Sequence, residues 1–181
     1  LNVGCIPSKS LLDSSYKFHQ ITHGLEEHGI TLSKPKLELS KMMERKNSIV
    51  KKLTSGVSQL FAHNKVTSIH GRGKLIDQNT VEVTDDKGKK KKVTAKNIIL
   101  ATGSRPINIP SVPWNGTTII GSSGALELTE VPKNLAIIGA GVIGLELGSV
   151  WSRLGSKVEI FEAEKEFLPM LDKDVSRVIE R

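Results

Sequence analysis

The feature that most constrains the fold of this chain is a glycine-rich turn between a short apolar segment and an apolar helix. Residues 135–138 predict a buried strand, and residues 139–144 follow it with the spacing G-x-G-x-x-G. Apolar residues then repeat at helical spacing as far as Leu154, and residues 157–162 predict a second strand that ends in an acid. A strand, a glycine turn, a helix and a strand in this order form a βαβ unit, so the sequence predicts an α/β fold.

Each glycine of this turn has a physical reason to be glycine. Gly139 permits the tight turn, Gly141 lets a pyrophosphate approach the backbone, and Gly144 lets the helix pack closely on the strand. The phosphates would then meet the N-terminus of the helix. Glu162, about 20 residues further on, can accept hydrogen bonds from the hydroxyls of an adenosine ribose and repels a 2′-phosphate. The sequence therefore predicts a site for NAD rather than NADP, completed by Ala140, Val142 and Ile143.

Composition excludes several classes of protein. Hydrophobic residues make up 38% of the 181 residues, and no apolar run approaches the roughly 20 residues that span a bilayer. The first residues lack the basic and then apolar order of a secretory signal, so neither secretion nor membrane insertion is expected. A single cysteine excludes an internal disulfide and disfavours a zinc site with several cysteines, and we predict no metal.

The net charge of +7 permits binding to nucleic acid, but the excess is concentrated at residues 87–92, where lysines typically form a solvated turn. Aromatic residues are only 4% and do not alternate with basic ones, which disfavours the alternative of a basic nucleic-acid-binding module. The chain lacks an initiator Met, and residues 175–181 predict a helix that is still in progress. We therefore expect a fragment of a longer protein.

The first half of the chain predicts two helices and then a small antiparallel meander. Pro7 suits the first turn of a helix, and residues 37–62 predict a long amphipathic helix whose Met and Phe side chains we expect to pack in the core. Period-two alternation predicts strands at residues 66–70, 80–84 and 92–95. Residues 97–103 are almost continuously apolar, which predicts a central parallel strand buried on both faces.

The only cysteine, Cys5, lies at the predicted start of the first helix. A thiolate there is stabilised by unpaired backbone N–H groups and by the positive end of the helix dipole. This position favours redox chemistry, although a lone cysteine also packs as a small buried apolar residue.

Four segments resemble the flavin-dependent pyridine nucleotide–disulfide oxidoreductases. Residues 1–9 read L-N-V-G-C-I-P-S-K and match the redox-disulfide segment of that family after its first cysteine. Further matches are G-R-G-K at residues 71–74, A-T-G-S-R-P at residues 101–106 and G-A-G-V-I-G-L-E-L-G-S-V-W at residues 139–151. The resemblance implies parts of two Rossmann-like dinucleotide-binding domains, an FAD domain at residues 1–110 that carries the redox helix and the meander, and an NAD domain at residues 111–181.

Carried over residue by residue, the resemblance implies a redox site that joins these two domains. Cys5 would be the flavin-proximal sulfur of an active-site disulfide, whose other cysteine would directly precede Leu1. Lys9 and Glu146 would form an ion pair beside the reactive edge of the flavin, and Val142 would lie near the stacked nicotinamide. The implied catalytic residues are Cys5, Lys9 and Glu146. The implied FAD contacts are Lys9, Gly71, Ala101, Thr102, Gly103 and Ser104.

Within the family, Leu1 and residues 6–8 are similar to the dihydrolipoamide dehydrogenases. Glutathione reductases tend to have Val at the two apolar positions and use NADPH, as mercuric reductases do, and both stay open as alternatives. The resemblance implies a homodimer that oxidises dihydrolipoamide on the acyltransferase subunit of 2-oxo acid dehydrogenase complexes, in the bacterial cytoplasm or the mitochondrial matrix. The fragment alone is expected to be inactive.

Overall fold

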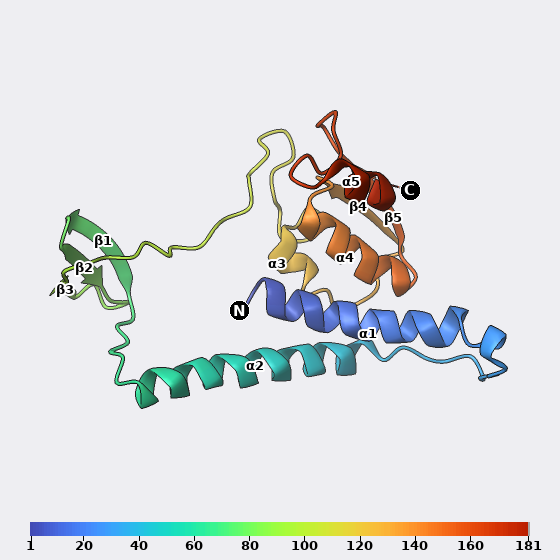
Figure 1. Cartoon of the computed structure of the whole chain (residues 1–181), viewed down its shortest axis with the longest axis horizontal. Coiled ribbons are helices and arrows are strands. Elements are labelled where there is room, and N and C mark those ends of the chain that lie inside the picture. Colours follow the sequence, from blue (N-terminus) through green and yellow to red (C-terminus); the bar gives the residue numbers. More distant parts are fainter. Residues whose placement is uncertain (181) are drawn as a thin grey trace. The chain divides into compact units, whose positions relative to one another are not determined.

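The computed structural model describes residues 1–180, and the chain divides into two compact units (Figure 1). Unit 1 comprises Leu1–Thr54 and the chain from Asn108 onward, and unit 2 comprises Ser55–Ile107. The predicted α/β class is confirmed, because helices combine with a parallel strand pair and a separate antiparallel sheet. The predicted C-terminal helix includes Arg181, which lies outside the described residues.

The order of the elements agrees with the sequence prediction over most of the chain. Unit 1 contains α1 (Cys5–His23), η1 (Glu26–His28), the first part of α2 (Leu39–His63), α3 (Ser122–Ala125), β4 (Asn134–Ile138), α4 (Val142–Arg153), β5 (Lys157–Phe161) and α5 (Lys173–Glu180). Unit 2 contains the end of α2 and the strands β1 (Arg72–Asp77), β2 (Thr80–Thr84) and β3 (Lys90–Thr94). Among the described residues, no helix is long and apolar enough to span a bilayer.

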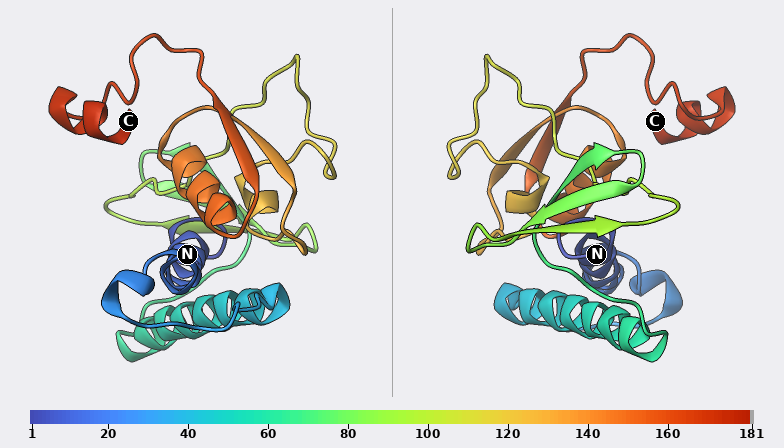
Figure 2. Two further views of the ribbon diagram at one scale, coloured as in Figure 1. Left: turned by 90° about the vertical axis from the view of Figure 1, so that its right-hand side faces the viewer. Right: turned by 90° about the vertical axis from the view of Figure 1, so that its left-hand side faces the viewer.

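The predicted βαβ unit is present around β4 and β5. The two strands pair in parallel, with Asn134 opposite Lys157 at one end and Ile138 opposite Phe161 at the other. Helix α4 connects them and lies against the sheet (Figure 2). Gly139 has φ of +101°, a conformation that L side chains rarely adopt. This unit therefore has the tight glycine turn that the sequence predicts.

The core of unit 1 lies between α1, α4 and the first half of α2, and α1 packs directly against α4. Its buried members are Leu11, Met42, Leu126, Leu147, Val150, Trp151 and Leu154. Burying one such apolar side chain contributes about 1.5–3 kcal/mol. Because most of these residues lie on α1 and α4, the core fixes α1 against α4.

Polar contacts join α2 to its neighbours in unit 1. Arg45 donates to the carboxylate of Asp13 at 2.9 Å and to the hydroxyl of Ser10 at 3.2 Å, which ties α2 to α1. The next residue, Lys46, is 1% exposed, and its ammonium donates to the backbone oxygen of Leu126 at 2.7 Å and to Glu127 at 2.6 Å. The amphipathic α2 thus buries the Lys46 ammonium between a buried backbone oxygen and the exposed carboxylate of Glu127.

Replacing Lys46 with Met is expected to lower the free energy of unfolding by about 1–3 kcal/mol. Methionine keeps the packing of the aliphatic stem but leaves the buried oxygen of Leu126 without this donor. Chemical denaturation of the folded chain measures the change. The matched control is Lys52→Met at an exposed position of the same helix, which should stay within about 0.5 kcal/mol of the unmodified chain.

Unit 2 corrects the first strand of the predicted meander. The sheet has the order β1-β2-β3 and is antiparallel throughout, as predicted, but residues 66–70 form no strand. The first strand is instead β1, because Gly71, with φ of +146°, turns the chain and Gly73 is accommodated inside the strand opposite Val83. Apolar and polar residues do alternate at residues 66–70, but β2 pairs with β1 and leaves no neighbouring strand for this segment.

Two further expectations for unit 2 are wrong. Residues 97–103 form no strand, and Ile99 and Leu100 are 90% and 70% exposed. A parallel strand needs hydrogen-bonding neighbours, and no described strand pairs with this segment. In α2 the predicted core packing holds for Met42, whereas Phe61 is 42% exposed, because the core of unit 1 reaches only the first half of the helix.

Candidate redox and dinucleotide site

The N-terminal turn of α1 carries the predicted redox residues. Cys5 is the first residue of the helix, as expected, and its free thiol is exposed rather than buried. The alternative that Cys5 is a small core residue is therefore wrong. Lys9 lies one turn further along α1, so both side chains project from the same end of the helix.

The predicted ion pair between Lys9 and Glu146 is present, although 137 positions separate the two residues in the sequence. The Lys9 ammonium donates to Oε1 of Glu146, which lies in the first turns of α4. The packing of α1 against α4 brings the two charges together within unit 1. The place of this pair beside a flavin stays a prediction.

Sequence reasoning missed a third member of this group. Ser8 is 7% exposed, and its hydroxyl donates to Oε2 of Glu146 at 2.6 Å. The carboxylate therefore accepts from two consecutive residues of α1, one through each oxygen. A buried hydroxyl needs a hydrogen-bond partner. Ser8 directly precedes Lys9, so the partner proposed for Lys9 could also have been proposed for Ser8.

These contacts hold the pKa of the Glu146 carboxyl below its usual value, first through the hydrogen bond from Lys9 and next through that from Ser8. Because the folded-state pKa is lowered, the group stabilises the fold fully at pH values above its ordinary value of 4.5, and this contribution is lost as the pH falls through the lower folded value. Glu146 is thus ionised at neutral pH, as an ion pair requires.

The glycine turn presents an open helix N-terminus to a ligand. Gly141 is the N-cap of α4, and none of the described side chains caps it. A Cβ on Gly141 would meet no atom within 4 Å, whereas a Cβ on Gly144 would collide with the backbone oxygen of Gly139. The turn therefore leaves open space for a pyrophosphate beside Gly141, while the backbone is closely packed at Gly144. Both features are expected of a dinucleotide-binding turn.

Glu162 follows β5 and reaches back to this turn. Its Oε2 accepts from the backbone N–H of Ala140 at 2.7 Å, and its Oε1 accepts from the N–H groups of Ala163 and Glu164. The hydrogen bonds from Glu164, Ala140 and Ala163 lower the pKa of the Glu162 carboxyl, so an anion stands at the strand end where a ribose is expected. Contact with the ribose stays a prediction.

The predicted FAD contacts are divided between the two units. Lys9 belongs to unit 1, whereas Gly71 and residues 101–104 belong to unit 2. Gly71 and Gly103 both have positive φ, +146° and +78°, and residues 101–104 are exposed and lie outside any helix or strand. Their conformations are compatible with close approach of a ligand to the backbone, and their contacts with FAD stay predictions.

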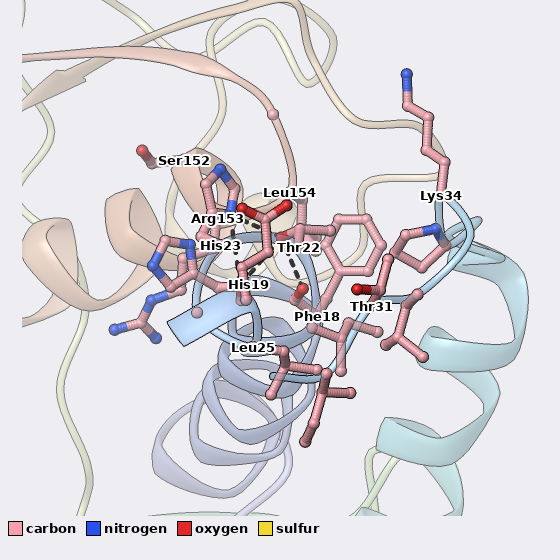
Figure 3. A pocket seen from close by; sticks show the side chains of 17 residues that line it. Phe18, His19, Thr22, His23, Leu25, Thr31, Lys34, Ser152, Arg153 and Leu154 are labelled. Atoms are coloured by element: carbon pink, nitrogen blue, oxygen red, sulfur yellow. Dashed lines mark hydrogen bonds between the residues drawn. The ribbon is translucent and has the colours of Figure 1, made fainter. Parts of the chain in front are cut away.

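A pocket of about 800 Å³ lies at the opposite end of α1 from Cys5 (Figure 3). It is bounded by the last turn of α1, the loop that contains η1, and the end of α4. His19 and His23 stack there with ring centroids 4.6 Å apart. The 19 residues of α1 span about 28 Å, so this pocket is separate from the redox end of the helix. His19 is half-buried, and the other four histidines, His23, His28, His63 and His70, are exposed.

Comparisons with known proteins agree with this arrangement. The chain is 44% identical over 181 residues to leghemoglobin reductase of Glycine max and 43% identical over 181 residues to the mitochondrial dihydrolipoyl dehydrogenase of Pisum sativum. Both alignments cover 100% of this chain but only 35% and 36% of the relatives. The chain thus spans about a third of the length of the curated relatives that it matches.

Solved structures give the same assignment of the fold. The HOCl-induced flavoprotein disulfide reductase RclA from Escherichia coli aligns with 99% of this chain and 37% of its own, with a TM-score of 0.74 and 28% sequence identity. The family described as pyridine nucleotide-disulphide oxidoreductase matches residues 1–181. Because this match extends over every residue of the sequence, the chain belongs to the pyridine nucleotide-disulphide oxidoreductase family.

Proposed function

We propose that the full-length protein containing this chain is a dihydrolipoamide dehydrogenase, which oxidises dihydrolipoamide to lipoamide and reduces NAD⁺. The observation that carries the proposal is the segment Cys5–Lys9 at the start of α1, with Lys9 paired to Glu146 on the dinucleotide helix. A redox-capable sulfur and a dinucleotide turn lie at the same ends of two packed helices. The name and 43% identity of the pea relative support lipoamide as the substrate class.

The chemistry is a transfer of two electrons from a dithiol to NAD⁺. The substrate dithiol loses two electrons and two protons and becomes a disulfide, while the disulfide that includes Cys5 is reduced by thiol–disulfide exchange. When bound, FAD would supply the two-electron redox chemistry that links the Cys5 sulfur to the nicotinamide. NAD⁺ finally gains a hydride and one proton is released, so atoms and electrons balance.

Some residues of this chain would take part in redox chemistry and others would bind the cofactors. Cys5 would carry the flavin-proximal sulfur, and Lys9, paired with Glu146, would place its ammonium beside the flavin. The turn from Gly139 to Gly144 holds the NAD pyrophosphate at the N-terminus of α4. We propose that residues 1–110 belong to the FAD-binding domain and residues 111–181 to the NAD-binding domain of the full-length protein.

The proposal includes the assembly and place of the full-length protein. As a dihydrolipoamide dehydrogenase it would be a homodimer acting on lipoyl groups of the acyltransferase subunit in 2-oxo acid dehydrogenase complexes. We propose the mitochondrial matrix in a eukaryote and the cytoplasm in a bacterium, and the mitochondrial name of the pea relative supports the first of these. We propose neither a nucleic acid nor a membrane as a partner.

The experiment that tests the function compares substrates of full-length, FAD-loaded protein. We expect rapid reduction of NAD⁺ with dihydrolipoamide and only weak oxidation of NADPH with glutathione disulfide or mercuric ion. The reverse preference would contradict the proposal and would favour a glutathione or mercuric reductase. The assay needs protein purified free of host enzyme.

Replacing Glu162 with Arg is expected to reduce the preference for NADH over NADPH by roughly ten- to a hundredfold, as measured by the ratio of kcat/KM values. The carboxylate is ionised at neutral pH, so it repels a 2′-phosphate, whereas a guanidinium attracts one. The control is Glu159→Arg, at an exposed position of β5. A parent protein that already prefers NADPH would refute the role of Glu162.

A further inference from the structure

The Glu146 carboxylate is held by two neighbouring residues that differ greatly in exposure. Ser8 is 7% exposed, and its hydroxyl bonds to Oε2 at 2.6 Å. The side chain of Lys9, which bonds to Oε1, is 61% exposed, while that of Glu146 is 24% exposed. One oxygen of the carboxylate is therefore fixed from inside the helix interface and the other faces a long, solvated side chain.

The hydrogen bonds from Ser8 and Lys9 differ in how firmly they hold the Glu146 carboxylate in one orientation. Consecutive residues of a helix are about 100° apart, so Ser8 faces the interface with α4 while Lys9 lies at its edge. An exposed lysine loses rotamer freedom when it pairs, and such a pair on its own holds its geometry weakly. A buried hydroxyl that donates to a carboxylate at 2.6 Å forms a short, charge-assisted bond with little freedom to move.

The hydroxyl of Ser8 is also not used within its own helix. Serines in helices commonly bond to a backbone oxygen of the preceding turn, as buried Ser15 does with Leu12 at 3.1 Å and half-buried Ser149 with Leu145 at 2.7 Å. Ser8 donates instead to a side chain 138 positions away on another helix. The hydrogen bond of Ser8 therefore links α1 to α4, whereas a bond to its own helix would have been enough to satisfy the buried hydroxyl.

We propose that Ser8 is a positioning residue, whose buried hydroxyl fixes the Glu146 carboxylate so that its other oxygen stays presented to Lys9. Lys9 can then leave and re-form its ion pair without reorientation of Glu146. The anion that Lys9 needs is held in place by α1 itself, through the residue just before Lys9. The inference rests on the proposed function only for its effect on rates.

The first test measures the Glu146 carboxyl directly in the full-length protein. Titration by NMR with labelled glutamate should show that Ser8→Ala raises the pKa of Glu146, because the variant removes one of two hydrogen bonds to the ionised form. The matched control is Ser15→Ala. It also removes a buried hydroxyl from α1, but the Ser15 hydroxyl donates to the backbone oxygen of Leu12 in the same helix. Alanine is the best helix former, so both variants should keep the helix.

The second test separates positioning from packing in the full-length, FAD-loaded protein. Ser8→Ala should slow reduction of the flavin by dihydrolipoamide by about tenfold with little change in KM, because Ser8 is buried away from substrate. In a Glu146→Gln background the same substitution should cost much less. The flavin absorption spectrum gives an independent record of any change in the position of Glu146 and Lys9 near the flavin.

Specific results would overturn the proposal. If Ser8→Ala leaves the pKa of Glu146 unchanged, the hydroxyl does not fix the carboxylate. If Ser8→Ala slows reduction equally with and without the Glu146 carboxylate, Ser8 serves packing alone. A full-length protein inactive towards dihydrolipoamide would refute the proposed function, yet the titration would still decide the role of Ser8.

Discussion

Replacing Cys5 with serine is expected to abolish oxidation of dihydrolipoamide by the full-length protein, with a loss in kcat/KM on the order of a thousandfold or more. A hydroxyl forms no disulfide, so electrons from the dithiol have no sulfur through which to reach the flavin. Cys5 is exposed at the first position of α1, where serine is well tolerated, and the core remains intact. Anaerobic stopped-flow absorbance with dihydrolipoamide measures the loss.

The control for this variant uses the opposite half of the reaction. Reduction of the flavin by NADH depends on the dinucleotide turn and not on the Cys5 sulfur, so Cys5→Ser should still oxidise NADH with an artificial electron acceptor. Loss of both half-reactions would indicate general damage. Substantial turnover of dihydrolipoamide by the variant would show that Cys5 is not the redox sulfur.

The parts of the structure that the sequence predicted well are those with local signals. The turn from Gly139 to Gly144 can be predicted from neighbouring residues alone, because the backbone conformation and close packing that require glycine arise within one βαβ unit. The start of α1 at Cys5 likewise follows from Pro7 and from a helical apolar period. The ion pair of Lys9 with Glu146 is a contact between distant residues, and it was predicted only through the resemblance to a family.

The failures concern pairing, which a single segment does not specify. Residues 97–103 are apolar enough for a central strand, yet a strand exists only beside another strand, and none is described there. The meander was predicted one segment too early because the pattern at residues 66–70 fits a strand as well as β1 does. Ser8 was missed because its partner lies on another helix.

The three glycines of the dinucleotide turn have different tasks, and two substitutions should separate folding from cofactor binding. Gly144→Ala is expected to destabilise the chain by about 1–3 kcal/mol, because its Cβ would collide with the backbone oxygen of Gly139 and crowd Ile137. The turn must then shift, so affinity for NADH should fall as well. Denaturation and fluorescence titration measure the two effects.

Gly141→Ala should lose binding without loss of stability. Gly141 has φ of −71° and ψ of 172°, which any residue adopts, and a Cβ there would meet no protein atom within 4 Å. Stability should therefore change by no more than about 0.5 kcal/mol. The added methyl group would occupy the space through which a pyrophosphate approaches the backbone, so NADH affinity should fall at least about tenfold. A Gly141→Ala protein that binds NADH as tightly as the unmodified one would show that the pyrophosphate does not lie at this turn, even if Gly144→Ala behaves as expected.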